Sequence, residues 1–294
     1  MRVLITGGSG FIGKNLSEAY RKKYTVFVPS HKELELTNFR AVEQYIKKNK
    51  IDAVIHCAIK GDGDVLETTL RMYLSILGNL SSLQKFIHFG SGAEYDKSRD
   101  LIKVKETHWG ERIPKDPYGL AKYICSEISK NYNKIITLRL FGVYGKYEDY
   151  RFKFISNTIA KTLFGLPIII KQDVVFDYLY ITDLVAICDY FLTHQSPYPD
   201  YNIIPDRSIK ISQLAQMIRE ISGKDLEISV KNKGENYEYT GDNKRLKRTI
   251  SNLKFTPYMD SVTELYRYYQ ENMHLFDKND LRKDKYLSAS KVRK

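Results

Sequence analysis

The sequence predicts an α/β fold: a doubly wound parallel sheet followed by a smaller mixed α/β C-terminal domain. Short β-rich runs alternate with helical patterns through the first half of the chain, which is typical of βαβ units and a parallel sheet. A glycine-rich segment joins the first apolar run to the first helical pattern. Beyond residue 150 the order is less regular, so the 294 residues divide into one doubly wound domain and a second, smaller part.

The first half supplies the predicted strands and helices of the doubly wound sheet. Strands are expected at residues 2–6, 24–29, 53–57, 85–89 and 135–140. Helices are expected at residues 11–23, 38–48 and 66–80 and from Pro117 onward. Pro117 marks a helix start because proline is well tolerated in a first helical turn, whereas the polar residues 96–116 predict an irregular segment.

The second half predicts more helix than strand. Helices are expected at residues 152–164, 183–193, 212–222 and 262–272, and strands near residues 167–171 and 174–180. No stretch approaches the length of apolar sequence that spans a membrane, so no membrane segment is expected. Residues 1–7 run into glycines without a small-residue cleavage site, so no signal peptide is expected either.

The formal net charge of +12 comes in part from the end of the chain. Residues 278–294 hold seven Lys or Arg against two Asp, and their weak apolar periodicity predicts a basic, flexible tail. The remaining surplus is spread without a run that resembles a recognition helix, so nucleic-acid binding is not expected. The three cysteines Cys57, Cys125 and Cys188 form no CxxC pattern, which excludes a disulfide framework and fits a reducing cytoplasm.

The segment Thr6-Gly7-Gly8-Ser9-Gly10-Phe11-Ile12-Gly13 predicts a dinucleotide site. Gly7 would allow the tight turn, Gly10 would let a pyrophosphate approach the backbone, and Gly13 would let helix and strand pack closely. The pyrophosphate would rest on the N-terminus of the helix that begins with Phe11 and Ile12, where free N–H groups favour anions. We therefore expect a nucleotide-binding Rossmann domain over residues 1–165, rejoined by a segment near 174–200, and a substrate domain over 166–277.

The end of the second strand bears on the choice of cofactor. NAD-binding domains usually place an Asp or Glu there for the ribose 2′-hydroxyl, but residues 28–32 contain no acid before Glu33. His31 and Lys32 could instead meet a 2′-phosphate. NADP(H) is therefore favoured, and NAD(H) remains possible.

Tyr118 and Lys122 lie four residues apart on one face of the helix that starts at Pro117. Ser91 follows the fourth strand, at the sheet edge where α/β proteins bind ligands. A tyrosine with a pKa of about 10 is a poor acid at neutral pH unless a cation lowers it, and Lys122 could do so. Ser91 could donate a hydrogen bond to a substrate oxygen. These three residues are the predicted catalytic set.

Taken in order, these motifs resemble the extended short-chain dehydrogenase/reductases that act on nucleotide sugars. The resemblance rests on the glycine segment, His56-Cys57-Ala58, Ser91 with Tyr95, Tyr118 to Lys122, and the segments 176–181 and 240–246. It implies NAD(P) in the first domain, with Ala58 at the cofactor, a nucleotide-diphosphate sugar in the second, and a homodimer formed through the helix that carries Tyr118. The residues that it places at the sugar substrate are Ser91, Gly92, Lys153, Asn157, Asp177 and Arg245.

Departures from the family pattern narrow the expected chemistry. Gly92 and Ala93 stand where the 4,6-dehydratases of the family carry an Asp-Glu pair, which disfavours dehydration. Ala93 also replaces the cysteine of members resembling GDP-fucose synthase, which disfavours epimerisation at C3 and C5. Phe176 replaces an arginine that contacts the diphosphate, a role that Arg245 or Lys153 could take over. Residues 33–37 are similar to the NADP-using reductases of 4-keto sugars.

The sequence supports three hypotheses about function. The first is an NADP(H)-dependent reductase, or dehydrogenase in reverse, acting at C4 of a nucleotide-diphosphate sugar such as a 4-keto-6-deoxy sugar. The second is a nucleotide-sugar 4-epimerase with tightly held NAD, which needs the same three residues. The third is a non-catalytic cofactor-binding scaffold that uses its basic tail for docking. No metal is expected, because the aspartates of residues 173–183 lack the spacing of metal ligands.

Overall fold

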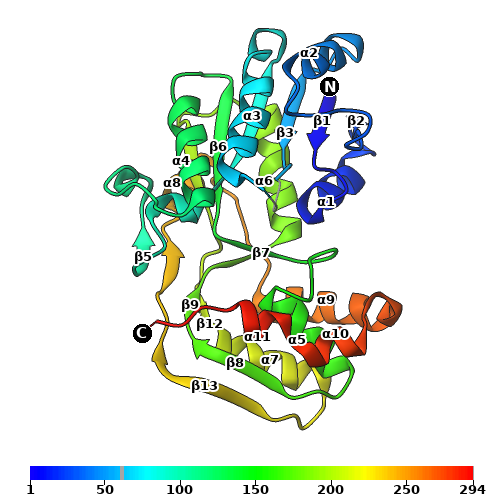
Figure 1. Ribbon diagram of the computed structural model, residues 1–294, viewed down its shortest axis with the longest axis vertical. Helices are drawn as coiled ribbons and strands as arrows, with labels where there is room; N and C mark the ends of the chain where they lie inside the picture. Colours follow the sequence, from blue (N-terminus) through cyan, green and yellow to red (C-terminus); the bar gives the residue numbers. More distant parts are fainter. Residues whose placement is uncertain (60–62, 294) are drawn as a thin grey trace.

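The computed structural model describes residues 1–59 and 63–293 and is built around a six-stranded sheet with the strand order β11-β6-β4-β3-β1-β2 (Figure 1). The strands are β1 (Arg2–Thr6), β2 (Thr25–Phe27), β3 (Ala53–His56), β4 (Lys85–Ser91), β6 (Ile135–Leu140) and β11 (Asp200–Ile203). Every neighbouring pair in this sheet is parallel. The predicted doubly wound parallel fold is therefore confirmed.

Helices cover both faces of the sheet because successive strand residues point in opposite directions. Val3 and Ile5 of β1 face α1 (Phe11–Tyr20) and α6 (Ile181–Thr193), whereas Leu4 faces the other three helices. These are α2 (Phe39–Lys48), α3 (Val65–Leu77) and α4 (Pro117–Ser129). Asp116 caps α4 by accepting a hydrogen bond from the Gly119 N–H, and the helix begins at Pro117 as predicted.

The second lobe combines three main helices with short strands. The helices are α5 (Phe154–Leu163), α7 (Ile211–Ser222) and α9 (Tyr258–Glu271), with the short α8 (Lys244–Thr249) beside β11. β8 (Ile168–Asp173) pairs with β13 (Ile228–Glu235), and β7 (Gly142–Tyr144) pairs with β10 (Tyr178–Tyr180). A four-stranded sheet has the order β12 (Ile209–Lys210), β9 (Val175–Phe176), β14 (Tyr239–Gly241) and β5 (Leu101–Val104).

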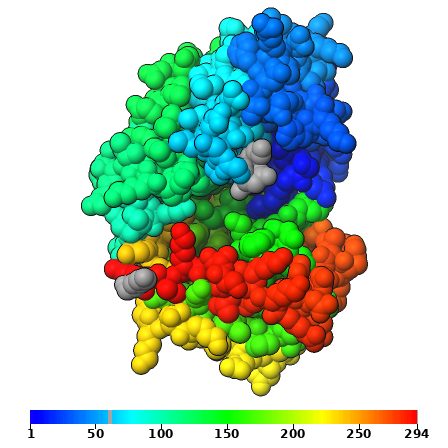
Figure 2. All heavy atoms as spheres, in the orientation of Figure 1, coloured from blue at the N-terminus to red at the C-terminus, as the bar shows by residue number. Residues whose placement is uncertain are grey.

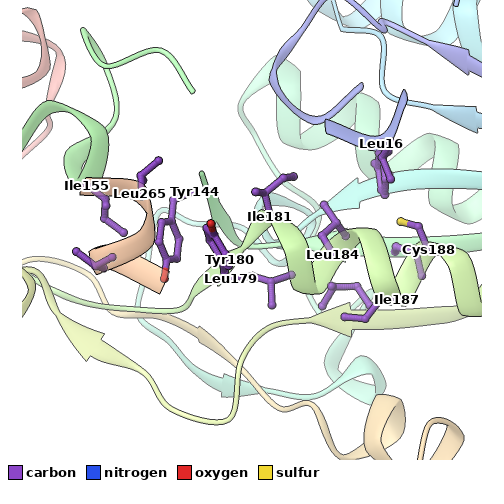
Figure 3. Close-up of a cluster of buried hydrophobic side chains, with 14 of the residues drawn as sticks. Leu16, Tyr144, Ile155, Leu179, Tyr180, Ile181, Leu184, Ile187, Cys188 and Leu265 are labelled. Carbon is purple, nitrogen blue, oxygen red and sulfur yellow. The ribbon is translucent and has the colours of Figure 1, made fainter. Parts of the chain in front are cut away.

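One apolar core continues from the parallel sheet into the second lobe. Figure 3 shows Leu184, Ile187 and Cys188 of α6 on the side of Leu16, and Tyr180 and Tyr144 leading on toward Ile155 and Leu265. Figure 2 shows a recess between the two lobes, with the end of the chain along its lower rim. No helix of the described part is long and apolar enough to cross a bilayer.

The predicted elements of the first half end within three residues of the observed ones, but several strands of the chain were not predicted, among them β5 and β11. β11 supplies the sixth strand of the parallel sheet, just beyond the predicted rejoining segment. Its sequence is not an apolar run, because it contains Asp200 and Asn202. Both side chains are buried, and each forms hydrogen bonds with residues distant in sequence. β5 lies inside the segment predicted to be irregular and is held by pairing with β14.

The C-terminal segment differs from the flexible tail that the sequence predicted. It forms α10 (Lys278–Lys283) and α11 (Lys285–Ala289) and lies against α5 and β8. Leu281 is buried, Tyr286 packs against Phe154, and the ammonium of Lys161 forms a buried ion pair with Asp284. Five of the described cations of this segment are exposed: Lys278, Arg282, Lys283, Lys291 and Arg293. The three anchors are too few to give a clear helical period.

We predict that the Lys161–Asp284 pair stabilises the folded chain. Asp284→Asn leaves the ammonium of Lys161 buried opposite a neutral amide, and should lower the free energy of unfolding by about 3 kcal/mol. The matched control is Asp280→Asn, because Asp280 faces Lys285 at 3.7 Å near the surface and should contribute less than about 1 kcal/mol. Urea unfolding of both variants measures the difference. Equal effects would contradict the prediction.

Candidate active site

The loop between β1 and α1 depends on glycine because neighbouring atoms occupy the space of a side chain. Gly7 has a φ of +66°, and a Cβ there would lie 2.7 Å from the backbone of Ala58. A Cβ on Gly13 would lie 2.3 Å from the carbonyl oxygen of Gly7, so Gly13 lets α1 pack on the loop. Gly8 belongs to the same set, although its motif role was not predicted, because its Cβ would lie 1.9 Å from Cγ1 of Val28.

A cavity of about 690 Å³ opens over this loop. Its lining includes the glycine loop, the segments that follow β2 and β3, and one face of α3, and it contains the predicted residues Gly7, Gly10, His31 and Ala58. Gly10 is the N-cap of α1 and has no side chain to bond the first turn, which begins with Phe11 and Ile12. The free N–H groups of that turn suit a pyrophosphate. These residues therefore fit a dinucleotide.

The cavity also contains an acid that the sequence reasoning missed. Glu35 lies in the lining, where its carboxylate accepts hydrogen bonds from the backbone and hydroxyl of Thr37 and lies 3.3 Å from Nδ1 of His31. Glu33 instead accepts a hydrogen bond from the N–H of Ser30 and is exposed. Lys32 is an exposed residue of the same turn. The signal for Glu35 was its i,i+4 spacing from His31, which returns it to the same side of the turn.

We predict that Gly7→Ala impairs coenzyme binding. The new methyl group would meet the Ala58 backbone at 2.7 Å, so the loop must move away from the cavity. The dissociation constant for coenzyme should rise at least about tenfold. Gly165→Ala is the control, since Gly165 has a similar φ of +67° but open space around its Cβ position. Calorimetric titration of coenzyme into both variants separates the effect of a side chain at a positive φ from loss of the coenzyme site.

Ser91 ends β4 and opens a short 3-10 turn, Gly92–Tyr95. Its Oγ accepts a hydrogen bond from the N–H of Ala93 at 3.2 Å, and its own N–H donates to Oε1 of Glu94 at 2.8 Å. Glu94 is buried and held by Nε of Arg139 at 2.6 Å. A reciprocal cap therefore fixes the backbone of Ser91 at the carboxyl end of the central strand.

α4 brings Tyr118 and Lys122 to this end of β4. Lys122 is buried, and its Nζ donates to the carbonyl oxygen of Phe89 at 2.7 Å. Tyr118 is half-buried one turn earlier on the helix. The approach depends on Gly119, because a Cβ there would lie 2.8 Å from the carbonyl oxygen of Ala93, in the turn that follows Ser91. The predicted catalytic residues thus meet at one edge of the sheet.

Tyr239 of β14 is a site residue that no motif indicated. A Cβ on Gly92 would lie 2.5 Å from the Tyr239 hydroxyl, so this hydroxyl covers the residue after Ser91. Burial raises the pKa of Tyr239, and a hydrogen bond with the Ser91 side chain opposes that effect. Its ring stacks on Phe176 at 4.8 Å and contacts Phe141 at 5.0 Å. Tyr239 comes to this place through strand pairing between distant segments, and no local pattern in the sequence indicates it.

Two residues predicted to bind substrate are occupied by contacts within the chain. Asp177 is buried, and its carboxylate accepts hydrogen bonds from the Ser208 hydroxyl at 2.5 Å and the Gly241 N–H at 2.8 Å. Burial raises the pKa of Asp177, and these bonds oppose that effect. Asn157 is also buried, and its amide donates to the carbonyl oxygen of Tyr150 at 2.9 Å. Both side chains hold the walls of the second lobe together.

The two predicted diphosphate contacts lie in different surroundings. Arg245 forms an ion pair with Asp200, and its Nε lies 3.8 Å from Glu106. Its guanidinium is thereby engaged beside β11. Lys153 is exposed at the N-cap of α5. Of the two, Lys153 has the side chain that is open to solvent and to an anionic ligand.

Comparison with known proteins agrees with this geometry. A model of the NAD dependent epimerase/dehydratase family matches residues 3–203. GDP-L-colitose synthase of Yersinia pseudotuberculosis is 28% identical over 184 residues, 55% of this chain and 60% of that protein. The chain therefore spans only three-fifths of the length of that relative. GDP-6-deoxy-D-talose 4-dehydrogenase of Aggregatibacter actinomycetemcomitans is 24% identical over 288 residues, 91% of this chain and 97% of that protein.

A solved structure confirms the fold. The GDP-L-fucose synthetase of Naegleria fowleri bound to NADP superimposes with a TM-score of 0.81 at 18% identity, covering 93% of this chain and 95% of that one. The family model spans the parallel sheet from β1 to β11, and with it the glycine loop, Ser91, Tyr118 and Lys122. The resemblance predicted from these motifs is confirmed: the chain belongs to the NAD-dependent epimerase/dehydratase family.

Proposed function

We propose that the chain reduces, or in reverse oxidises, C4 of a nucleotide-diphosphate sugar with NADP(H), and that its substrate is a 4-keto-6-deoxy sugar. One observation carries the proposal. Ser91, Tyr118 and Lys122 gather at the carboxyl end of β4, while the two positions after Ser91 are Gly92 and Ala93. These two positions thus add no acid–base pair to the proton donor and its cation, which suits a single hydride and proton transfer.

The chain's own residues would act on the oxygen of the 4-keto group. Bound NADPH would supply the hydride to C4. Ser91 would donate a hydrogen bond to the oxygen, and Tyr118 would deliver its proton as negative charge develops there. Lys122, which uses one of its three donors for the Phe89 carbonyl, would use the other two to hold Tyr118 and the coenzyme ribose in place.

The choice of C4 and of a 6-deoxy sugar draws support from one relative. The protein matched over 97% of its length is named GDP-6-deoxy-D-talose 4-dehydrogenase. Its name states a redox reaction at C4 of a nucleotide-linked 6-deoxy sugar. At 24% identity the relative supports this class of reaction.

The coenzyme preference depends on the turn after β2. His31 lines the cavity, and the nearby Lys32 adds a second cation for a 2′-phosphate. Glu35, in contrast, could accept a hydrogen bond from a 2′-hydroxyl, and this specific observation favours the second candidate, a 4-epimerase with tightly held NAD. Denaturing the purified chain and identifying the nucleotide released separates them. Near-stoichiometric NAD would favour the epimerase, and an empty site that prefers NADPH over NADH would favour the reductase.

The reductase is tested by mixing the chain with NADPH and a panel of nucleotide-diphosphate 4-keto-6-deoxy sugars. We expect NADPH to be consumed in proportion to a product whose C4 bears a hydroxyl, as seen by NMR. Interconversion of 4-hydroxy sugars without net coenzyme consumption would overturn the reductase and establish the epimerase.

The chain's assembly and location are proposals as well. We propose a cytoplasmic homodimer formed through α4, the arrangement that the family resemblance implied. Light scattering of the purified chain measures the mass, and a monomer at assay concentration would contradict this arrangement.

A further inference from the structure

The residue after Ser91 and the hydroxyl of Tyr239 occupy one space. A side chain at Gly92 would place its Cβ 2.5 Å from the Tyr239 hydroxyl oxygen and 2.8 Å from Cζ of the same ring. Gly92 is itself buried. A glycine at this position therefore makes room for a phenol hydroxyl beside the predicted catalytic serine.

The strands and rings around Tyr239 hold its hydroxyl in this place. Tyr239 pairs with Phe176 of β9 on one side and with Leu101 of β5 on the other. Its carbonyl oxygen accepts a hydrogen bond from the N–H of Asp177. The ring lies between Phe176, at 4.8 Å, and Phe141, at 5.0 Å. A ring fixed by pairing on two sides and by two aromatic contacts can aim its hydroxyl without losing much side-chain freedom on binding substrate.

The hydrogen-bond capacity of Ser91 shows what this hydroxyl can do. A serine hydroxyl has two acceptor positions and one hydrogen to donate. The N–H of Ala93 donates to Oγ at 3.2 Å and takes one acceptor position. The hydroxyl of Tyr239 lies against Gly92, the next residue along the chain, and an interaction with the Ser91 side chain partly offsets the rise that burial causes in the Tyr239 pKa. If Tyr239 donates, both acceptor positions are filled, and the hydrogen of Ser91 is left for a substrate oxygen.

We propose that Tyr239 is a positioning residue that donates its hydroxyl hydrogen to Oγ of Ser91 and so directs the hydrogen of Ser91 toward the substrate oxygen. The inference rests on the proposed function, in which Ser91 binds the oxygen at C4, and it adds a residue from the second lobe to that site. Through Tyr239 the two lobes are joined at the reacting atoms, so substrate seated on the second lobe is presented to an already oriented Ser91.

Tyr239→Phe keeps the ring contacts and removes only the hydroxyl. We expect kcat to fall about tenfold while KM changes less than about twofold, because Ser91 would lose orientation and not the substrate-binding walls. The matched control is Tyr237→Phe, two residues earlier, whose ring is exposed and lies under the guanidinium of Arg293. The control should keep the kcat of the unaltered chain.

A double-mutant cycle with Ser91→Ala tests whether Tyr239 acts through Ser91. The double variant should be no slower than Ser91→Ala alone, because without the serine hydroxyl there is nothing left to orient. An equal loss from Tyr239→Phe in both backgrounds would overturn the proposal, since Tyr239 would then act on the substrate independently.

A spectroscopic measurement keeps the inference testable even if the proposed substrate is wrong. With 3-fluorotyrosine placed at position 239, Ser91→Ala should shift the fluorine resonance, and a label at position 237 should not move. An unchanged resonance at position 239 would overturn the hydrogen bond itself. Failure of all 4-keto sugars as substrates, together with a shifted resonance, would overturn the proposed function and leave the Tyr239–Ser91 pair standing.

Discussion

Tyr118→Phe is expected to lower kcat by a factor of about a hundred to ten thousand, the range that a positioned proton donor contributes. The variant keeps the half-buried ring on α4 and the buried bond from Lys122 to the Phe89 carbonyl. The dissociation constant for coenzyme and the unfolding midpoint should therefore stay close to those of the unaltered chain. Steady-state reduction of the nucleotide-linked 4-keto sugar, with coenzyme titration on the same preparation, measures both.

Tyr123→Phe supplies the control on the same helix. Tyr123 stacks on Trp109 at 4.3 Å, and its hydroxyl takes no part in the proposed chemistry. We expect this variant to retain full activity. If Tyr118→Phe also retained full activity, Tyr118 would not be the proton donor, and the proposed mechanism would be wrong whatever the substrate.

The part of the site that sequence reasoning located is the part encoded by neighbours along the chain. The turn at Gly7 and the packing at Gly13 depend on residues of one short segment, and Tyr118 and Lys122 share a helix face because of their spacing. Ser91 could be placed because a strand end in a parallel sheet lies at a known edge. These features follow from local geometry, and the structure places them where that geometry requires.

What sequence reasoning missed depends on pairing between distant segments. The Tyr239 hydroxyl lies against Gly92, the residue after Ser91, because β14 joins β5 and β9, a combination of three short strands. Arg245 was one of two cations expected at a diphosphate, and the structure adds an ion pair between Arg245 and Asp200, which lies in a strand that was not predicted. The tail was expected to be flexible, yet its Asp284 forms an ion pair with the buried Lys161. Lys161 lies on a helix that ends more than a hundred residues earlier. In each case the distant residue or strand that makes the contact could not be identified from the sequence.

Arg139→Met is expected to give the largest loss of stability. The Arg139 side chain is fully buried, and it holds Glu94 through Nε at 2.6 Å and Asp200 through Nη1 at 2.5 Å. Removing the guanidinium leaves two buried carboxylates without their shared cation, although Trp109 and Arg245 each keep one contact to them. The free energy of unfolding should fall by about 4 kcal/mol or more, as for other broken buried ion pairs.

A control variant and a rescue variant separate the effect of burial from the effect of unpaired charge. Arg151→Met removes an arginine whose pair with Asp149 is partly exposed, and should cost less than about 1 kcal/mol. Adding Glu94→Leu and Asp200→Asn to Arg139→Met removes the unpaired charges, and should recover part of the lost stability. Because Glu94 also accepts the N–H of Ser91, the triple variant should fold better than Arg139→Met and yet remain a poor catalyst. A triple variant less stable than Arg139→Met would contradict the argument that the unpaired carboxylates cause the loss of stability.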